Sequence, residues 1–210
     1  VLFDRYTYFM SPFLFIMLAL LLVSNKRKGI AITILALYAV CNIYCLELTN
    51  YYWKRSAYIV KRLLNEIPPP GNKTIVLLNL PENMNGILMT GAQDESLWKL
   101  AHNLVSDHKI DNEVYDAASF NMTTPEDGAH VNVINDSTIR VTLNQWGTWW
   151  WYKYRGGISY ENAAYKLDMK DGGHYYELIL KRDPATYLLL FAKGDKWQQA
   201  DLSRKNIDQY

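Results

Sequence analysis

Two long apolar runs occupy the N-terminal quarter of the chain. The first covers residues 6–23 and the second covers residues 30–47, and the charged stretch Asn25-Lys26-Arg27-Lys28-Gly29 separates them. At about 1.5 Å per residue, each run approaches the thickness of the hydrocarbon core of a bilayer. We therefore predict a hairpin of two transmembrane helices. A buried helical hairpin inside a soluble domain is the alternative.

Aromatic residues flank both predicted helices at the expected level of the lipid head groups. Amphipathic rings favour this interface, where one end of the side chain is apolar and the other is hydrated. We predict a membrane-interface belt made of Tyr6, Tyr8, Tyr51, Tyr52 and Trp53.

The segment after the second run keeps a helical periodicity but becomes more polar. Its apolar positions are Ala57, Val60, Leu63, Leu64 and Ile67. This spacing predicts an amphipathic helix, which the prolines at 68–70 then end. We expect three parts: a membrane part at 1–52, a juxtamembrane helix and Pro-rich linker at 53–71, and a soluble domain at 72–210.

The C-terminal two thirds alternates mainly with the period of β-strands. The apolar run 74–80 predicts a buried strand, and an amphipathic helix follows it, with its apolar face at Leu97, Leu100, Ala101, Leu104 and Val105. Residues 131–143 predict one hairpin around Asn135-Asp136-Ser137, and residues 175–192 predict a second. The expected fold class is a soluble α+β domain, mostly antiparallel, after a two-helix transmembrane hairpin.

Charge is unevenly divided between the two regions. The chain up to residue 71 has eight basic and three acidic residues, whereas the remainder has fourteen basic and eighteen acidic residues. A basic membrane-proximal region suits anionic head groups, and the acidic domain lacks the clustered positive charge that nucleic-acid binding requires. Both cysteines, Cys41 and Cys45, lie in the second apolar run, so we expect them to be small buried apolar side chains or helix-contact residues, with no disulfide framework.

No familiar catalytic or metal-binding pattern is present. The four histidines are scattered, there is no His-Glu-x-x-His or Cys-x-x-Cys spacing, and no serine lies in a Gly-x-Ser-x-Gly turn. We predict no metal and no cofactor, and the catalytic residues, if any, stay unknown.

The densest unusual feature is a run of tryptophans. A strand through it would place Trp149 and Trp151 on one face and Trp150 on the other, with Trp146 just before. Ring faces pack well against the C–H face of a sugar. Trp146, Trp149, Trp150 and Trp151 are therefore candidate ligand-binding residues, against the alternative of aromatic core or membrane-interface packing.

Two short motifs resemble those of a known superfamily of membrane enzymes. Asp4-Arg5-Tyr6, followed by Tyr8 and an apolar helix, resembles a segment before a late helix of the bacterial multi-pass glycosyltransferase C superfold. The strand that ends in Leu80-Pro81, followed by Gly86, resembles the tail region of its bacterial members. The chain also begins with Val1 without a signal-peptide pattern, so we expect it to be the C-terminal piece of a longer protein.

The resemblance implies a parent enzyme that moves a sugar from a polyprenyl phosphate to an acceptor outside the membrane. The family's acidic catalytic residue would lie upstream, so no catalytic residue is carried over and the enzymatic status of this chain stays open. The implied partners are the lipid bilayer, a lipid-linked sugar or glycan and further transmembrane helices upstream of Val1. The alternative is a non-enzymatic, membrane-anchored binding module of the cell envelope.

The orientation in the membrane follows from the positive-inside rule only in part. The 25–29 loop carries three basic residues, while residues 54–62 carry four. Because basic residues are denser in the loop, and because of the resemblance, we expect the loop in the cytoplasm. This places the domain on the periplasmic side of a bacterial inner membrane.

Overall fold

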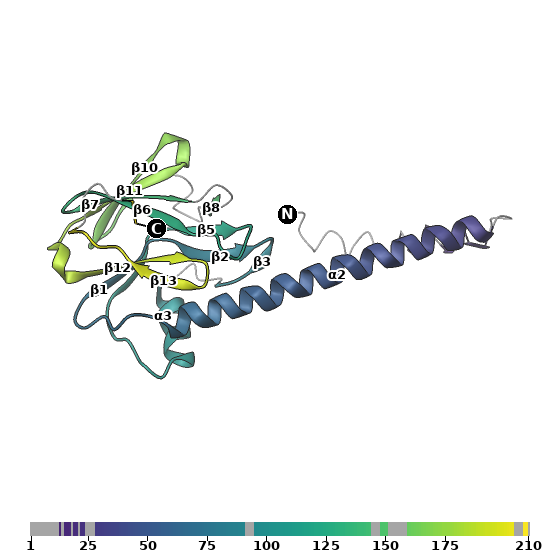
Figure 1. Ribbon diagram of the computed structural model, residues 1–210, viewed down its shortest axis with the longest axis horizontal. Helices are drawn as coiled ribbons and strands as arrows, with labels where there is room; N and C mark the ends of the chain where they lie inside the picture. Colours follow the sequence, from purple (N-terminus) through teal and green to yellow (C-terminus); the bar gives the residue numbers. More distant parts are fainter. Residues whose placement is uncertain are drawn as a thin grey trace. The chain divides into compact units, whose positions relative to one another are not determined.

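The protein divides into two compact units. The computed structural model describes residues 13, 15–17, 19–20, 22–23, 28–90, 95–143, 148–150, 159–203 and 208–209. The first unit is Val1–Trp53 and the second is Lys54–Tyr210. Helix α2 (Lys28–Asn65) begins in the first unit and ends in the second (Figure 1).

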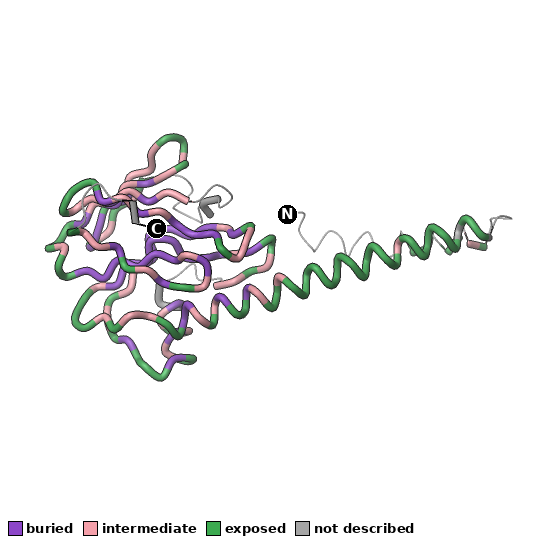
Figure 2. The backbone as a smooth tube through the Cα atoms, in the orientation of Figure 1, coloured by how far each residue is buried: buried purple, intermediate pink, exposed green. Residues whose placement is uncertain are grey.

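One helix in the described part of the chain, rather than the predicted two, is long and apolar enough to cross a membrane. It comprises Ile32–Asn65, and none of its most apolar window is buried within the protein. Figure 2 shows α2 exposed over most of this length. Most of the other predicted span, 6–23, lies outside the described residues.

Polar side chains within the apolar part of α2 hydrogen-bond to their own helix. Thr33 Oγ1 donates to Gly29 O over 3.0 Å, and Asn42 Nδ2 donates to Tyr38 O over 2.7 Å. Such bonds to the carbonyl four residues earlier satisfy polar groups that water cannot reach in a bilayer. The helix therefore keeps its polar residues compatible with a lipid environment.

The described part of the second unit contains three sheets. The central sheet has the order β13-β12-β1-β4, with bounds Lys196–Gln199, Tyr187–Lys193, Thr74–Leu77 and Val114–Asp116. The six-stranded sheet has the order β14-β6-β7-β11-β10-β9, with bounds Asp208–Gln209, Ala129–Asn135, Thr138–Leu143, Tyr175–Leu180, Tyr165–Lys170 and Tyr160–Glu161. The small sheet has the order β3-β2-β5-β8, with bounds Ile87–Leu88, Leu80–Met84, Ser119–Met122 and Thr148–Trp150.

The central and small sheets are mixed, whereas every described pair in the six-stranded sheet is antiparallel. The parallel pairs are β1 with β12, β1 with β4, and β2 with β5. The predicted hairpin at 131–143 is confirmed as β6 and β7. Its turn is closed by Asn135 Oδ1, which accepts from the Ser137 backbone N–H over 3.0 Å.

The predicted second hairpin, over residues 175–192, is wrong. Strand β11 pairs with β10 and β7, whereas β12 pairs with β1 and β13. The short 3-10 turn η3 (Pro184–Thr186) instead carries the chain from one sheet to the other. The burial patterns explain the difference, because β11 is buried at alternate residues while β12 is buried at nearly all of them. A strand buried on both faces belongs in the middle of a layered fold.

The predicted strand at 74–80 is broken at Asn79. This fully buried side chain donates from Nδ2 to Ala192 O over 2.8 Å, and its Oδ1 accepts from Ala192 N over 2.6 Å. One amide thus replaces a step of backbone pairing beside β12. The chain then moves from β1 in the central sheet to β2 in the small sheet.

The main core lies between the central sheet and the six-stranded sheet. Its buried side chains come from both: Val76, Leu189 and Phe191, and Val131, Val133, Ile139, Val141, Leu167 and Leu178. Ile75 and Leu77 alternate with Val76, so they point to the opposite face of the central sheet, and they are buried as well. That opposite face is the one that the helices cover.

Three buried tyrosines cross between these two sheets. Tyr176 OH of β11 donates to Leu78 O over 2.5 Å, and Tyr187 OH of β12 donates to Ala164 O over 2.5 Å. Tyr165 OH of β10 donates to Asp116 O over 3.2 Å. Each phenol thus fills core volume and also satisfies a backbone carbonyl of the opposite layer.

Helix α3 (Glu95–Val105) forms where the sequence predicts a helix, but its predicted buried face is wrong. Leu100, Leu104 and Val105 are 55%, 74% and 54% exposed. The neighbouring face is buried instead, with Trp98 1% exposed and His102 2% exposed. A tryptophan fills the space against the central sheet, and this large side chain decides which way the helix turns.

Candidate functional site

The C-terminal turns of α2 are built into the second unit. Ile59, Leu63 and Leu64 are buried, although the helix is exposed over its apolar part. Burying three large aliphatic side chains contributes about 1.5–3 kcal/mol each. The predicted juxtamembrane helix is therefore continuous with the long apolar helix and packs as part of the second unit.

One tryptophan bonds to this end of α2, and a second tryptophan packs against the first. Trp197 of β13 donates its indole N–H to Leu63 O over 2.7 Å. Trp98 of α3 meets Trp197 edge to face, with 6.3 Å between ring centroids. A carbonyl in the last turn of a helix has no partner within the helix, so the Trp197 bond satisfies a group that would otherwise be buried and unpaired.

His102 contacts the same helix end from α3. Its Nδ1 lies against Leu64 O, and its Nε2 lies 2.8 Å from His108 O. Trp98 stacks on the imidazole, with 5.7 Å between centroids and 13° between planes. Figure 1 shows α3 beside the C-terminal end of α2, in agreement with these contacts.

An ionic network closes the outer side of the joint. Arg62 pairs with Glu66 at 2.6 Å and with Asp195 at 3.4 Å, and it lies 5.9 Å from the Tyr58 ring centroid. The hydrogen bond to Glu66 raises the pKa of Arg62 further above its usual range. Because this network is partly exposed to water, it contributes little to stability. The buried residues therefore supply most of the free energy that holds the end of α2 in the domain.

The predicted aromatic belt is divided between described and undescribed residues. Tyr51 and Trp53 are exposed, Tyr52 is half-buried, and Tyr51 and Tyr52 meet edge to face at 5.3 Å. Tyr6 and Tyr8 lie outside the described residues. Whether these five rings meet lipid head groups stays a prediction.

The predicted tryptophan site is described only in its backbone. Residues Trp149 and Trp150 lie on β8, which pairs with β5 at the edge of the small sheet. Trp146 and Trp151 fall outside the described residues. The ligand-binding role of this run therefore stays a prediction, on a strand that the structure places at a sheet edge.

Glu82 is a polar group that the sequence analysis missed. It lies at the irregularity of β2 between Pro81 and Asn83, it is 3% exposed, and its Oε2 has no hydrogen-bond partner. Burial raises the pKa of this carboxyl, and a hydrogen bond with Thr90 opposes the rise. A buried carboxyl without a counterion favours its neutral form.

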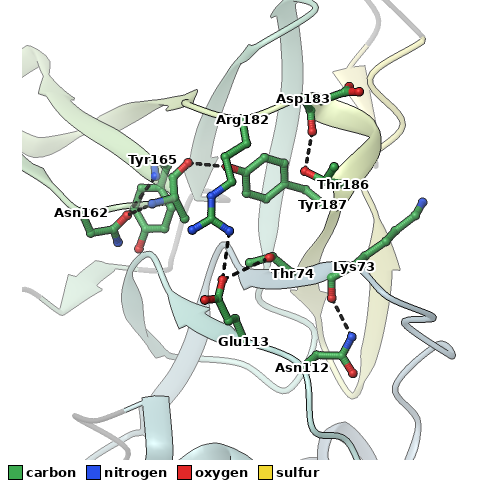
Figure 3. Close-up of polar contacts among 11 residues, drawn as sticks. Lys73, Thr74, Asn112, Glu113, Asn162, Tyr165, Arg182, Asp183, Thr186 and Tyr187 are labelled. Atoms are coloured by element: carbon green, nitrogen blue, oxygen red, sulfur yellow. Dashed lines mark hydrogen bonds and ion pairs between the residues drawn. The ribbon is translucent and has the colours of Figure 1, made fainter.

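Figure 3 shows a cluster of polar contacts near the start of β1. Arg182 pairs with Glu113 at 3.0 Å, and Glu113 also accepts from Thr74 Oγ1 over 3.4 Å. Asn112 Nδ2 donates to Lys73 O over 2.8 Å. These contacts join the loop before β12 to the start of β1. Among the described residues, no group of three metal-ligating side chains converges.

The site that the described residues support best is therefore the joint between α2 and the domain. Trp98, His102 and Trp197 were not predicted, because their partners come from remote parts of the sequence. The only local signal is the spacing of Trp98 and His102, which places them on one face of a helix.

No protein-family profile, curated protein or solved structure matches the chain.

Proposed function

We propose that the chain is a membrane anchor joined to an accessory domain, and that it forms the C-terminal part of a polytopic glycosyltransferase-like protein. The observation that carries the proposal is the burial of Ile59, Leu63 and Leu64 in the last turns of α2, where Trp197 donates to Leu63 O. A flexible linker would only keep a domain near a membrane. Here the apolar helix continues into the core of the domain, so attachment to the membrane would depend on the folded structure of the domain.

The membrane part would comprise the predicted two-helix hairpin, with 6–23 as the partner of α2. The domain would lie outside a bacterial inner membrane, with the 25–29 loop in the cytoplasm. Sealed inverted membrane vesicles test this orientation. Trypsin should cleave at Lys26 or Arg27 and leave the domain intact. Cleavage in the domain, with the 25–29 loop protected, would show that the protein has the opposite orientation.

The glycosyltransferase-like parent is supported by the Asp4-Arg5-Tyr6 segment and by the tail-like motif around Leu80. It would use sugars linked to polyprenyl phosphate, and its catalytic residues would lie upstream of Val1. The test is the intact mass of the native product extracted from membranes. We expect a mass far above 24.4 kDa, as a chain with many further apolar helices would have. A mass near 24.4 kDa would exclude a glycosyltransferase-like parent.

A second candidate function is a non-enzymatic module that binds a glycan or another envelope partner. The observation that favours it is the place of Trp149 and Trp150 on β8, the outermost of the described strands of the small sheet. Trp149→Ala and Trp151→Ala should then abolish glycan binding without changing the melting temperature. If both variants fail to fold, the two rings are core residues and not ligand-binding residues.

A further inference from the structure

The part of α2 that belongs to the second unit has two different faces. The buried face packs into the domain and comprises Ser56, Ile59 and Leu63. The exposed face comprises Lys54, Tyr58 and Lys61. Residues that follow one another at intervals of four and three lie on the same side of a helix, so these three side chains form one stripe along its outer surface.

The four basic residues of this segment differ in their partners. Arg62 pairs with Glu66 at 2.6 Å and with Asp195 at 3.4 Å, so two carboxylates already balance its charge. The other three, which form no ion pair with any residue that the structure describes, are Lys54, Arg55 and Lys61. The positive charges of these three side chains are therefore open to a ligand.

The ring of Tyr58 positions one of these cations. The guanidinium carbon of Arg55 lies 5.3 Å from the Tyr58 ring centroid. On the other side, the Tyr58 hydroxyl accepts a hydrogen bond from Arg62 Nη1 over 3.0 Å, and the ion pairs of Arg62 hold that arginine in place. A guanidinium fixed in this way loses less conformational freedom when it binds the oxygens of a phosphate with two parallel N–H groups.

Lys54 and Arg55 also stand at a suitable level for lipid head groups. They follow Leu48, the last leucine of the apolar part of α2, by six and seven residues. In a continuous helix this spacing corresponds to about 9–11 Å, and the head-group layer on each side of a bilayer is about 5–8 Å thick. Long basic side chains can bridge the remaining distance. Lys61 comes about 20 Å after Leu48, beyond this layer.

We infer that Lys54 and Arg55 form a binding site for the phosphate groups of anionic phospholipids, with Tyr58 as the residue that positions Arg55. The inference rests on the proposed function for the membrane location of α2. Because Ile59 packs into the domain on the opposite face of the same turns, a lipid bound here would fix the height of the domain above the bilayer.

Native mass spectrometry of the full chain in detergent tests the site, with phosphatidylglycerol as the anionic probe and phosphatidylcholine as the zwitterionic one. We expect the wild type to bind phosphatidylglycerol more tightly. The double variant Lys54→Gln/Arg55→Gln should lower that affinity about 25-fold, because each basic residue near lipid contributes about fivefold. Its affinity for phosphatidylcholine should not change. An unchanged affinity for phosphatidylglycerol would overturn the inference.

Lys61→Gln is the matched control, because it removes the same charge from the same face of the helix at a greater distance from the apolar part. It should lower the phosphatidylglycerol affinity less than about twofold. Equal effects of Lys61→Gln and Lys54→Gln would indicate general charge attraction and overturn the assignment of a site.

Two substitutions of Tyr58 test its positioning role. Tyr58→Leu removes the ring beneath Arg55 and should weaken phosphatidylglycerol binding, whereas Tyr58→Phe keeps the ring and should follow the wild type. Equal affinities in the wild type and Tyr58→Leu would exclude this role.

Stability and the source of the phosphate are controlled in the same samples. Lys54→Gln alone changes one exposed side chain, and its melting temperature should equal that of the wild type while its lipid affinity falls. Inorganic phosphate at the lipid concentration should not displace phosphatidylglycerol, and displacement would assign the site to a free phosphate instead of a lipid. Carbonate extraction of membranes tests the anchor separately. Extraction of the wild type would contradict the proposed function, whereas a resistant wild type with unchanged lipid affinity in the double variant would contradict the binding site alone.

Discussion

The Trp197 indole N–H donates to the Leu63 carbonyl oxygen over 2.7 Å, although these residues are far apart in the chain. This bond joins the last turns of the apolar helix to an outer strand of the central sheet. The end of α2 is thereby part of the tertiary structure, and damage to this joint should lower the stability of the whole domain.

Trp197→Phe tests the joint directly. Phenylalanine keeps most of the buried ring but leaves Leu63 O without its donor, which should lower the free energy of unfolding by about 1–3 kcal/mol. Urea unfolding in detergent measures the difference. Trp53→Phe is the matched control, because Trp53 is 56% exposed and should change stability little. Equal effects of the two substitutions would contradict the importance of the hydrogen bond.

The orientation of α3 is tested by comparing its two faces. Trp98→Ala removes a fully buried indole and should cost about 3–5 kcal/mol. Leu104→Ser, on the face that the sequence pattern favoured for burial, should cost less than about 0.5 kcal/mol. Thermal melts of both variants measure the two losses of stability. A large loss in Leu104→Ser would show that the face predicted from the sequence is the buried one.

Glu82 should give the domain an unusual pH dependence. Burial raises the pKa of its carboxyl in the folded state. The folded state therefore binds this proton more tightly than the unfolded state, so the contribution to stability is largest at acidic pH and is lost as pH rises through the folded pKa. Glu82→Gln should be more stable than the wild type near pH 8, and the difference should shrink near pH 4.

Glu161→Gln provides the opposite sign in the same measurement. Lys181 lowers the pKa of Glu161 through a hydrogen bond, so the ionised form stabilises the fold above the unfolded pKa and this contribution disappears as pH falls. Removal of this exposed carboxylate should therefore have an effect, if any, that fades toward acidic pH. A Glu82→Gln profile of the same direction as that of Glu161→Gln would refute the assignment of a buried neutral carboxyl.

Gly128 marks a close approach between the strand ends. A Cβ atom added there would lie 2.7 Å from both Ala192 O and Lys193 Cα, which are backbone atoms that cannot easily move. Gly128→Ala should lower stability by about 1–3 kcal/mol. Gly29→Ala is the control, because no atom lies within 4 Å of its added Cβ. A melt of Gly128→Ala that overlays the wild type would contradict this packing.

Local patterns predicted the elements whose partners are close in sequence. The β6–β7 hairpin needs only alternation and the Asn135 turn, and both are visible in the chain. The apolar stretch of α2 also follows from composition alone. In these cases the nearest neighbours in sequence are also the neighbours in space.

Remote packing explains the predictions that failed. Nothing near β12 indicates that its partner is β1, more than a hundred residues earlier, and a hairpin with β11 is the simpler local choice. Likewise, leucines suggested one buried face for α3, while a single tryptophan and its contact with Trp197 determine the other. The joint at Leu63 and Leu64 could not be predicted, because each of its bonds links segments that the sequence keeps apart.

The three cross-layer tyrosines have a mechanical consequence. Tyr176 and Tyr165 reach from the six-stranded sheet to the central sheet, and Tyr187 reaches back in the other direction. Hydrogen bonds that run in opposite directions between two layers oppose sliding of the layers, because a shift that shortens one bond lengthens another. The layers should therefore separate in a single cooperative step rather than by gradual sliding.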